Sequence, residues 1–253
     1  MKAILLIHGF LTDYRDFDNL VPRLKEQYDY IHLLVIPGHK GLDSDVIDYN
    51  RFTFDETFKL IRATMEYLLS KYDIVDVIGF SMGGALATYL ANKYDFNKLV
   101  LLAPANKFFN FSLPINRLSY FVRTVIERMN SKRLTKDEIK VIDQELGNVR
   151  IDDVKSLQIA FHRLIPNYNI HTLTTFIRII NECNININEI KNPTLLIWGE
   201  LDQLVPKKSV NELYQKITNE NKKIIIYKDI SHLMLNSKNS LKIIEEILVF
   251  LKN

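Results

Sequence analysis

The chain has 253 residues, of which 47% are hydrophobic and 25% charged, the balance of an ordinary globular protein. Its 33 basic and 30 acidic residues leave a formal net charge of only +3, which argues against a nucleic-acid-binding protein, since such proteins cluster their basic residues. The single cysteine, Cys183, excludes an internal disulfide and a zinc site of the thiolate kind, so a cytoplasmic protein is expected.

Short apolar runs alternate with amphipathic stretches along most of the chain. Strands are predicted at 3–8, 31–36, 74–80, 98–103, 194–199 and 223–227, and helices near 16–27, 55–71, 82–94, 207–218 and 237–251. The strands are almost continuously apolar, which is typical of parallel strands covered by helices on both faces. The predicted fold is therefore α/β, with three layers around a mostly parallel sheet. No apolar run approaches the length of a membrane span, so no transmembrane segment is expected.

The alternation of strands and helices is interrupted between residues 106 and 191, where only helical patterns rich in aromatic residues occur. Because strands resume afterwards, this segment is predicted to be a helical cap inserted into a core formed by residues 1–105 and 192–253. We expect cap aromatics and neighbouring loop residues to line an apolar acyl pocket: Phe108, Phe109, Phe121, Phe161, Leu11, Leu204, Val205 and Leu233. The alternative is that the aromatics form the core of the cap itself.

A basic stretch also lies within the predicted cap. It is interpreted as a solvated helix face, with weak contact to an anionic membrane surface as the alternative, and comprises Arg123, Arg128, Lys132, Arg133, Lys136 and Lys140.

Glycines are scarce in this chain, yet three of the eight lie between Gly79 and Gly84. The segment Gly79-Phe80-Ser81-Met82-Gly83 follows a predicted strand and opens a predicted helix, which is the context of a G-x-S-x-G nucleophile elbow. The residues two before and two after the serine approach each other in such a turn, so neither can carry a Cβ. Ser81 is therefore the candidate nucleophile.

A serine nucleophile needs a base, and the base needs an acid that orients it. His232 follows the last predicted strand, and Asp202 follows the strand before it, so both are expected at the same sheet edge as Ser81. The chain order serine, acid, histidine is the one used by this architecture. Glu200 and Asp229 are the alternative acids.

An oxyanion hole requires two N–H groups aimed at one point. Met82 follows the nucleophile and supplies one candidate. The loop His8-Gly9-Phe10 follows the first predicted strand, and the Phe10 N–H is the second candidate. Gly9 permits close approach of the backbone, and His8 is interpreted as a residue that holds the loop.

These motifs together resemble the α/β-hydrolase-fold serine hydrolases, in particular small bacterial carboxylesterases and monoacylglycerol-lipase-like enzymes. The matching residues include Pro37-Gly38-His39 and Val205-Pro206 besides the segments above, and the two leading strands of the fuller fold are missing. The resemblance implies a hydrolase without a metal or organic cofactor.

The sequence thus predicts hydrolysis of carboxylic esters through an acyl-enzyme on Ser81, with small-molecule acyl esters of short to medium length or monoacylglycerols as substrates. Three other reactions with the same triad remain open: thioester cleavage, carbon–carbon bond hydrolysis and aminopeptidase activity. A non-catalytic small-molecule receptor on the same fold is a further alternative.

Overall fold

The computed structural model describes residues 1–41, 48–107, 170–185, 187, 189–202, 204–237 and 239–252. A single six-stranded sheet forms its centre, with the strand order β2-β1-β3-β4-β5-β6. The strands are β1 (Lys2–Ile7), β2 (Tyr30–Leu34), β3 (Ile74–Phe80), β4 (Leu99–Leu102), β5 (Thr194–Gly199) and β6 (Lys222–Tyr227). All neighbouring strands pair in parallel, so the predicted α/β fold is confirmed.

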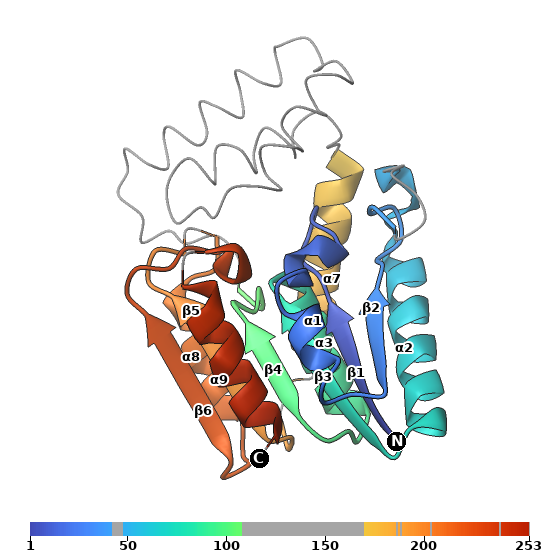
Figure 1. Ribbon diagram of the computed structural model, residues 1–253. Coiled ribbons are helices and arrows are strands. Elements are labelled where there is room, and N and C mark those ends of the chain that lie inside the picture. The colour runs from blue at the N-terminus through green and yellow to red at the C-terminus, as the bar shows by residue number, and fades with distance from the viewer. Residues whose placement is uncertain are drawn as a thin grey trace, which may run out of the picture.

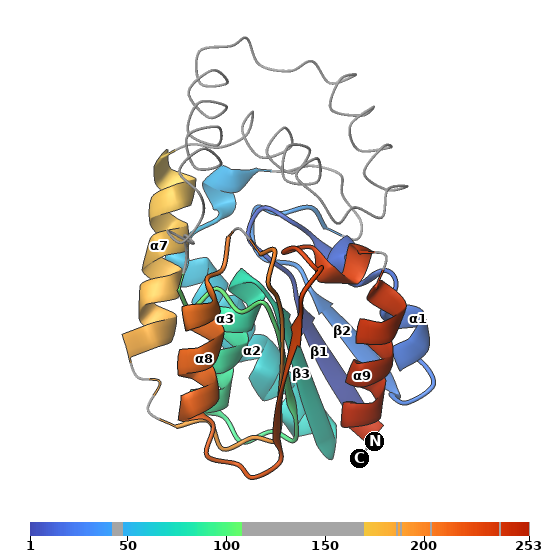
Figure 2. The same ribbon diagram turned by 90° about the vertical axis from the view of Figure 1, so that its left-hand side faces the viewer.

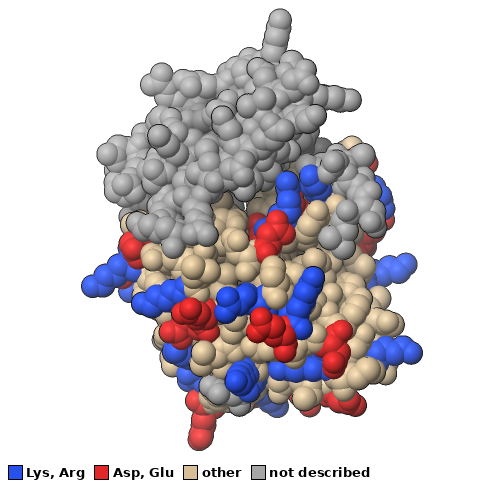
Figure 3. Space-filling model, in the orientation of Figure 1, with Lys and Arg blue, Asp and Glu red and all other residues tan. Residues whose placement is uncertain are grey.

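Helices cover both faces of this sheet (Figures 1 and 2). One face carries α1 (Val21–Leu24) and α9 (Ser240–Lys252), and the other carries α2 (Phe54–Lys71), α3 (Met82–Lys93) and α8 (Lys207–Lys216). The central strands are buried between these layers, which explains their continuous apolar sequences. None of the described helices is long and apolar enough to cross a membrane. Basic and acidic side chains are interspersed on the face shown in Figure 3.

Two predicted helices differ from the observed ones. The helix expected near 16–27 is split into a 3₁₀ turn, Tyr14–Phe17, and the short α1, because Pro22 fits the first turn of a helix but not its interior. The helix expected near 237–251 is α9, which runs from Ser240 to Lys252. Its buried face includes Ile243, Ile244, Ile247, Phe250 and Leu251, whereas Leu241 is 57% exposed.

The last part of the predicted insertion is helix α7 (Ile170–Ile185), which packs against α3 and α2. Phe176 and Cys183 of this helix belong to the main hydrophobic core. Burial raises the pKa of the Cys183 thiol. The assignment of residues 106–191 to one cap remains a prediction, because residues 108–169 lie outside the described part of the chain.

Candidate active site

Ser81 lies at the junction between β3 and α3, in a backbone conformation that L-residues rarely adopt. Its φ of 55° and ψ of −117° place it in a tight strand-to-helix turn. A Cβ on Gly79 would overlap the Gly83 carbonyl, and one on Gly83 would overlap the Ile7 carbonyl on β1. The two glycines therefore allow the turn to form and to pack against the sheet, as the sequence predicted.

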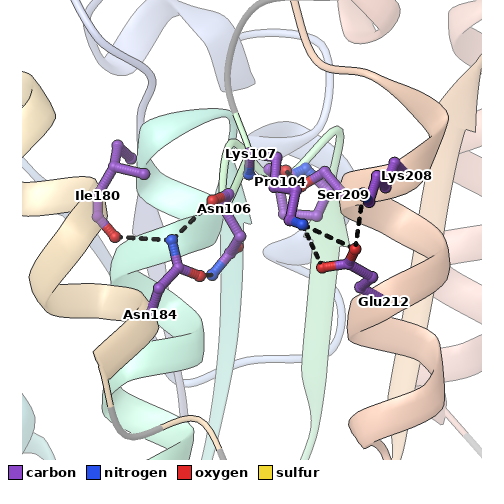
Figure 4. A network of polar contacts seen from close by, with 8 residues as sticks. All are labelled: Pro104, Asn106, Lys107, Ile180, Asn184, Lys208, Ser209 and Glu212. Carbon is purple, nitrogen blue, oxygen red and sulfur yellow. Dashed lines mark hydrogen bonds and ion pairs between the residues drawn. The ribbon is translucent and has the colours of Figure 1, made fainter.

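The main chain of Ser81 is fixed by the neighbouring strand β4. Its N–H donates to the Leu102 carbonyl at 2.9 Å, and its carbonyl accepts from the Ala105 N–H at 3.0 Å. The loop after β4 is in turn held between α7 and α8 (Figure 4). Asn184 donates to the Asn106 carbonyl at 2.6 Å, and Ser209 donates to the Pro104 carbonyl at 2.8 Å.

Three side chains from three different loops meet at the carboxyl edge of the sheet. His232 Nε2 lies 2.9 Å from Ser81 Oγ, and His232 Nδ1 lies 2.8 Å from Asp202 Oδ2. A carboxylate only accepts hydrogen bonds, so Nδ1 carries the hydrogen and Nε2 is free to accept from the serine hydroxyl. All three are buried: 7% of Ser81, 5% of His232 and 1% of Asp202 is exposed. The arrangement can take a proton from Ser81.

Asp202, and neither alternative acid, contacts His232. Its second oxygen, Oδ1, accepts the N–H groups of Leu204 and Val205, each at 2.9 Å, which fixes the plane of the carboxylate. Glu200 is exposed, and Asp229 accepts a hydrogen bond from Asn239 at the surface.

The two predicted oxyanion donors belong to main-chain segments that adjoin Ser81. Met82 is the first residue of α3, where an N–H has no partner within its own helix. Phe10 lies in residues 8–12, here called the β1 loop, and a side chain on Gly9 would press on the Cβ of Ser81 at 3.2 Å. Among the described residues, neither the Phe10 N–H nor the Met82 N–H donates a hydrogen bond.

Two buried histidines hold the β1 loop. His8 Nδ1 donates to the Gly9 carbonyl at 2.8 Å and His8 Nε2 accepts from the Ile36 N–H at 3.1 Å. His39 Nε2 accepts from the Leu11 N–H at 3.1 Å. Burial lowers the pKa of His8 to about 4 and that of His39 to about 3, so both rings are neutral acceptors at neutral pH.

Sequence reasoning missed one residue beside the site, Asp16. Its Oδ2 accepts from the Gly9 N–H at 3.3 Å and from the Thr12 hydroxyl. Burial raises its pKa to about 7, and the hydrogen bond from the Thr12 hydroxyl only partly offsets this effect. In the sequence this residue is one acid in a polar stretch, and only its contacts distinguish it from a solvated side chain.

The predicted pocket residues fall into two groups. Phe108, Phe109, Phe121 and Phe161, and the basic stretch from Arg123 to Lys140, lie outside the described residues.

The described group comprises the loop residues. Leu204 and Leu233 are half-buried, and Leu11 is buried with a φ of 57°. Val205 is fully buried, and its main-chain N–H donates to Asp202. Phe176 of α7 also borders the β1 loop, because its ring stacks on Phe10 with centroids 4.4 Å apart.

Comparison with known proteins assigns the chain to a family. A family model described as serine aminopeptidase, S33, matches residues 1–239. The chain belongs to this family. The protein is a hydrolase with the α/β-hydrolase fold, as its sequence predicted.

Its relatives include esterases and lipases. It is 27% identical to an uncharacterized hydrolase, YugF, of Bacillus subtilis over 86% of this chain and 79% of that protein. It is also 27% identical to the human monoacylglycerol lipase ABHD6, over 86% of this chain and 66% of that protein. Among solved structures, an esterase from Exiguobacterium antarcticum has the same fold, with a TM-score of 0.68 and 20% identity over 100% of this chain and 92% of that one.

Proposed function

We propose that the hydrolase cleaves carboxylic esters by forming an acyl-enzyme on Ser81. The observation that carries the proposal is the continuous hydrogen-bonded chain from Asp202 through His232 to Ser81, with distances of 2.8 and 2.9 Å. These lengths lie within hydrogen-bond reach, as proton transfer between nucleophile and base requires.

The first half-reaction follows from this geometry. Ser81 Oγ attacks the ester carbonyl carbon while His232 Nε2 takes the hydroxyl proton, and Asp202 stabilises the imidazolium that forms. The carbonyl oxygen becomes an oxyanion, which the N–H groups of Phe10 and Met82 bind, aided by the positive end of the α3 dipole. Collapse of the intermediate breaks the bond to the alcohol, which receives the proton from His232.

The second half-reaction returns the free enzyme. Water attacks the acyl-Ser81 carbonyl and gives a proton to His232, and the carboxylic acid leaves as Ser81 regains its proton. No step requires a metal ion or an organic cofactor.

The apolar character of the residues around the β1 loop supports an acyl ester as the substrate. Phe10 packs against the rings of Phe52 and Phe176, at centroid distances of 5.7 and 4.4 Å. Leu204 and Leu233 add half-buried apolar surface next to Asp202 and His232 in sequence. Short-to-medium acyl esters and monoacylglycerols match such apolar surroundings better than charged acyl groups.

The test combines a covalent probe with a substrate panel. An alkyl fluorophosphonate should label wild-type protein at Ser81, and Ser81→Ala should abolish both labelling and turnover of p-nitrophenyl butyrate. Full esterase activity in Ser81→Ala would refute the mechanism. Faster turnover of acyl-CoA, a carbon–carbon substrate or an aminoacyl amide than of any ester would refute the proposed substrate class, and acylation without turnover would favour a receptor.

A further inference from the structure

Asp16 connects the 3₁₀ turn Tyr14–Phe17 to the β1 loop. Its Oδ2 accepts hydrogen bonds from the Gly9 N–H and from the Thr12 side chain, and these two attachment points bracket Phe10 and Leu11. Leu11 is itself held by His39 through its N–H and has a φ of 57°. The N–H groups before and after Phe10 are thus both occupied, whereas the Phe10 N–H between them donates no hydrogen bond within the described part of the chain.

Folding stability does not explain a carboxylate at this position. Asp16 is only 8% exposed, and its hydrogen bonds come from neutral donors. Within the described ranges no basic side chain forms an ion pair with it, whereas the neighbouring Asp13 pairs with Arg15 at 2.6 Å. Burial of a carboxylate without a cation is costly, and burial accordingly raises the pKa of Asp16.

We propose that Asp16 is a positioning residue that sets the direction of the Phe10 N–H by holding Gly9 and Thr12 on either side of it. The inference rests on the proposed function, because the Phe10 N–H matters only when an oxyanion forms at Ser81. Asp16 touches neither the substrate nor the reacting atoms. Its effect should therefore appear in the transition state and leave substrate binding almost unchanged.

Two variants separate the acceptor from the charge. Both hydrogen bonds reach the same oxygen, so the single amide oxygen of Asp16→Asn can replace it, while Asp16→Leu removes the acceptor at similar size. Loss of one oxyanion donor costs about 10²–10³ in kcat, and a misdirected donor is expected to cost about 10–100-fold in Asp16→Leu. Asp16→Asn should stay within about threefold of wild type. Asp13→Asn, a buried acid in the same segment, is the control.

The readouts distinguish positioning from a structural role. In Asp16→Leu we expect kcat for p-nitrophenyl butyrate to fall with KM nearly constant, and the inhibition constant of an alkylboronic acid, which forms a tetrahedral adduct on serine, to rise by the same factor. The control variant should change neither constant, even if its melting temperature falls.

Three outcomes would overturn the inference. The first is a normal kcat and a normal boronate affinity in a folded Asp16→Leu protein. The second is an equal loss of kcat in Asp16→Asn and Asp16→Leu, which would assign the effect to the negative charge of Asp16 acting on His232. The third is a rise in KM alone. Failure of the proposed acyl-enzyme mechanism on Ser81 has a different signature, because wild-type protein would then neither react with the fluorophosphonate nor bind the boronate.

Discussion

Replacement of Asp202 by asparagine tests the role of the His232 tautomer. Both carboxylate oxygens of Asp202 accept hydrogen bonds: Oδ2 accepts from His232 Nδ1, and Oδ1 accepts from two main-chain N–H groups. An asparagine side chain has one oxygen and one NH₂ group. Its oxygen must face the two N–H donors, because the reverse orientation would place donors against donors. The NH₂ group is then directed at His232 Nδ1.

That orientation reverses the hydrogen bond to the nucleophile. When Nδ1 of His232 accepts a hydrogen bond, the hydrogen of the neutral ring resides on Nε2. Nε2 then donates to Ser81 Oγ and cannot remove its proton. The same substitution in serine proteases lowers kcat by about 10⁴, which corresponds to about 5.5 kcal/mol of activation free energy.

We expect Asp202→Asn to fold normally and to lose about four orders of magnitude in kcat for p-nitrophenyl butyrate, with a parallel loss in the rate of fluorophosphonate labelling. The melting temperature should change little, since both main-chain donors keep an acceptor. Asp229→Asn, at the alternative acid, is the matched control and should retain full activity. A loss of less than tenfold in Asp202→Asn would refute the assignment of Asp202 as the orienting acid.

Three further outcomes are expected. Gly83→Ala should lower the free energy of unfolding by at least about 3 kcal/mol or prevent folding, because a Cβ there overlaps a carbonyl of β1. The control Gly41→Ala, whose added Cβ meets its nearest atom at 3.9 Å, should change the free energy of unfolding measured by chemical denaturation by less than about 0.5 kcal/mol. Asp16→Asn should gain stability relative to wild type as the pH rises from about 4 to about 7 in urea titrations, and the gain should level off above pH 7, because within this window the native state keeps a proton on Asp16 that the unfolded state has lost; a constant difference would contradict this. Phe176→Ala should lower the unfolding free energy by about 3–5 kcal/mol, whereas Ile177→Ala, 43% exposed on the same helix, should cost less than about 1 kcal/mol; equal losses would place Phe176 outside the core.

The sequence predicted those parts of the protein that depend on local pattern and chain order. Parallel strands follow from continuous apolar runs, and the order of Ser81, Asp202 and His232 along these strands predicts that they meet at one sheet edge. The steric demand at the elbow also follows from local geometry, because the close contact involves residues four apart.

Features that depend on tertiary packing could not be predicted in the same way. Which apolar residues of α9 are buried depends on where the helix docks on the sheet: Ile243 and Ile244 are buried, whereas Leu241, which is as apolar, is 57% exposed. The sequence of helix α7 has the same kind of helical pattern as the segments before it. Its packing against α3 depends on contacts between residues that are far apart in the sequence. The function of Asp16 depends on a hydrogen bond to a main-chain N–H, for which a sequence has no signal.

Two buried aspartates differ in how their charge is compensated at the amino and the carboxyl ends of the strands. Asp76, near the start of β3, is fully buried, yet it accepts from Tyr28 at 2.5 Å and from Asn97 at 2.6 Å, and Lys2 lies 3.2 Å away. Its charge is compensated, as a structural carboxylate requires. Asp16 has two neutral donors, and its burial raises its pKa to about 7.

The same contrast extends to the main chain. The positive φ angles of the non-glycine residues Leu11, Ser81 and Ala103 all occur just after the carboxyl ends of strands, within the described ranges. Strain and uncompensated charge thus gather where Ser81, the β1 loop and Asp16 meet, and the apolar core below keeps them in place. If the backbone strain preorganises donors for an oxyanion, relieving it should stabilise the protein and slow its chemistry together, which is the relation expected when stability is sacrificed for a fixed active-site geometry.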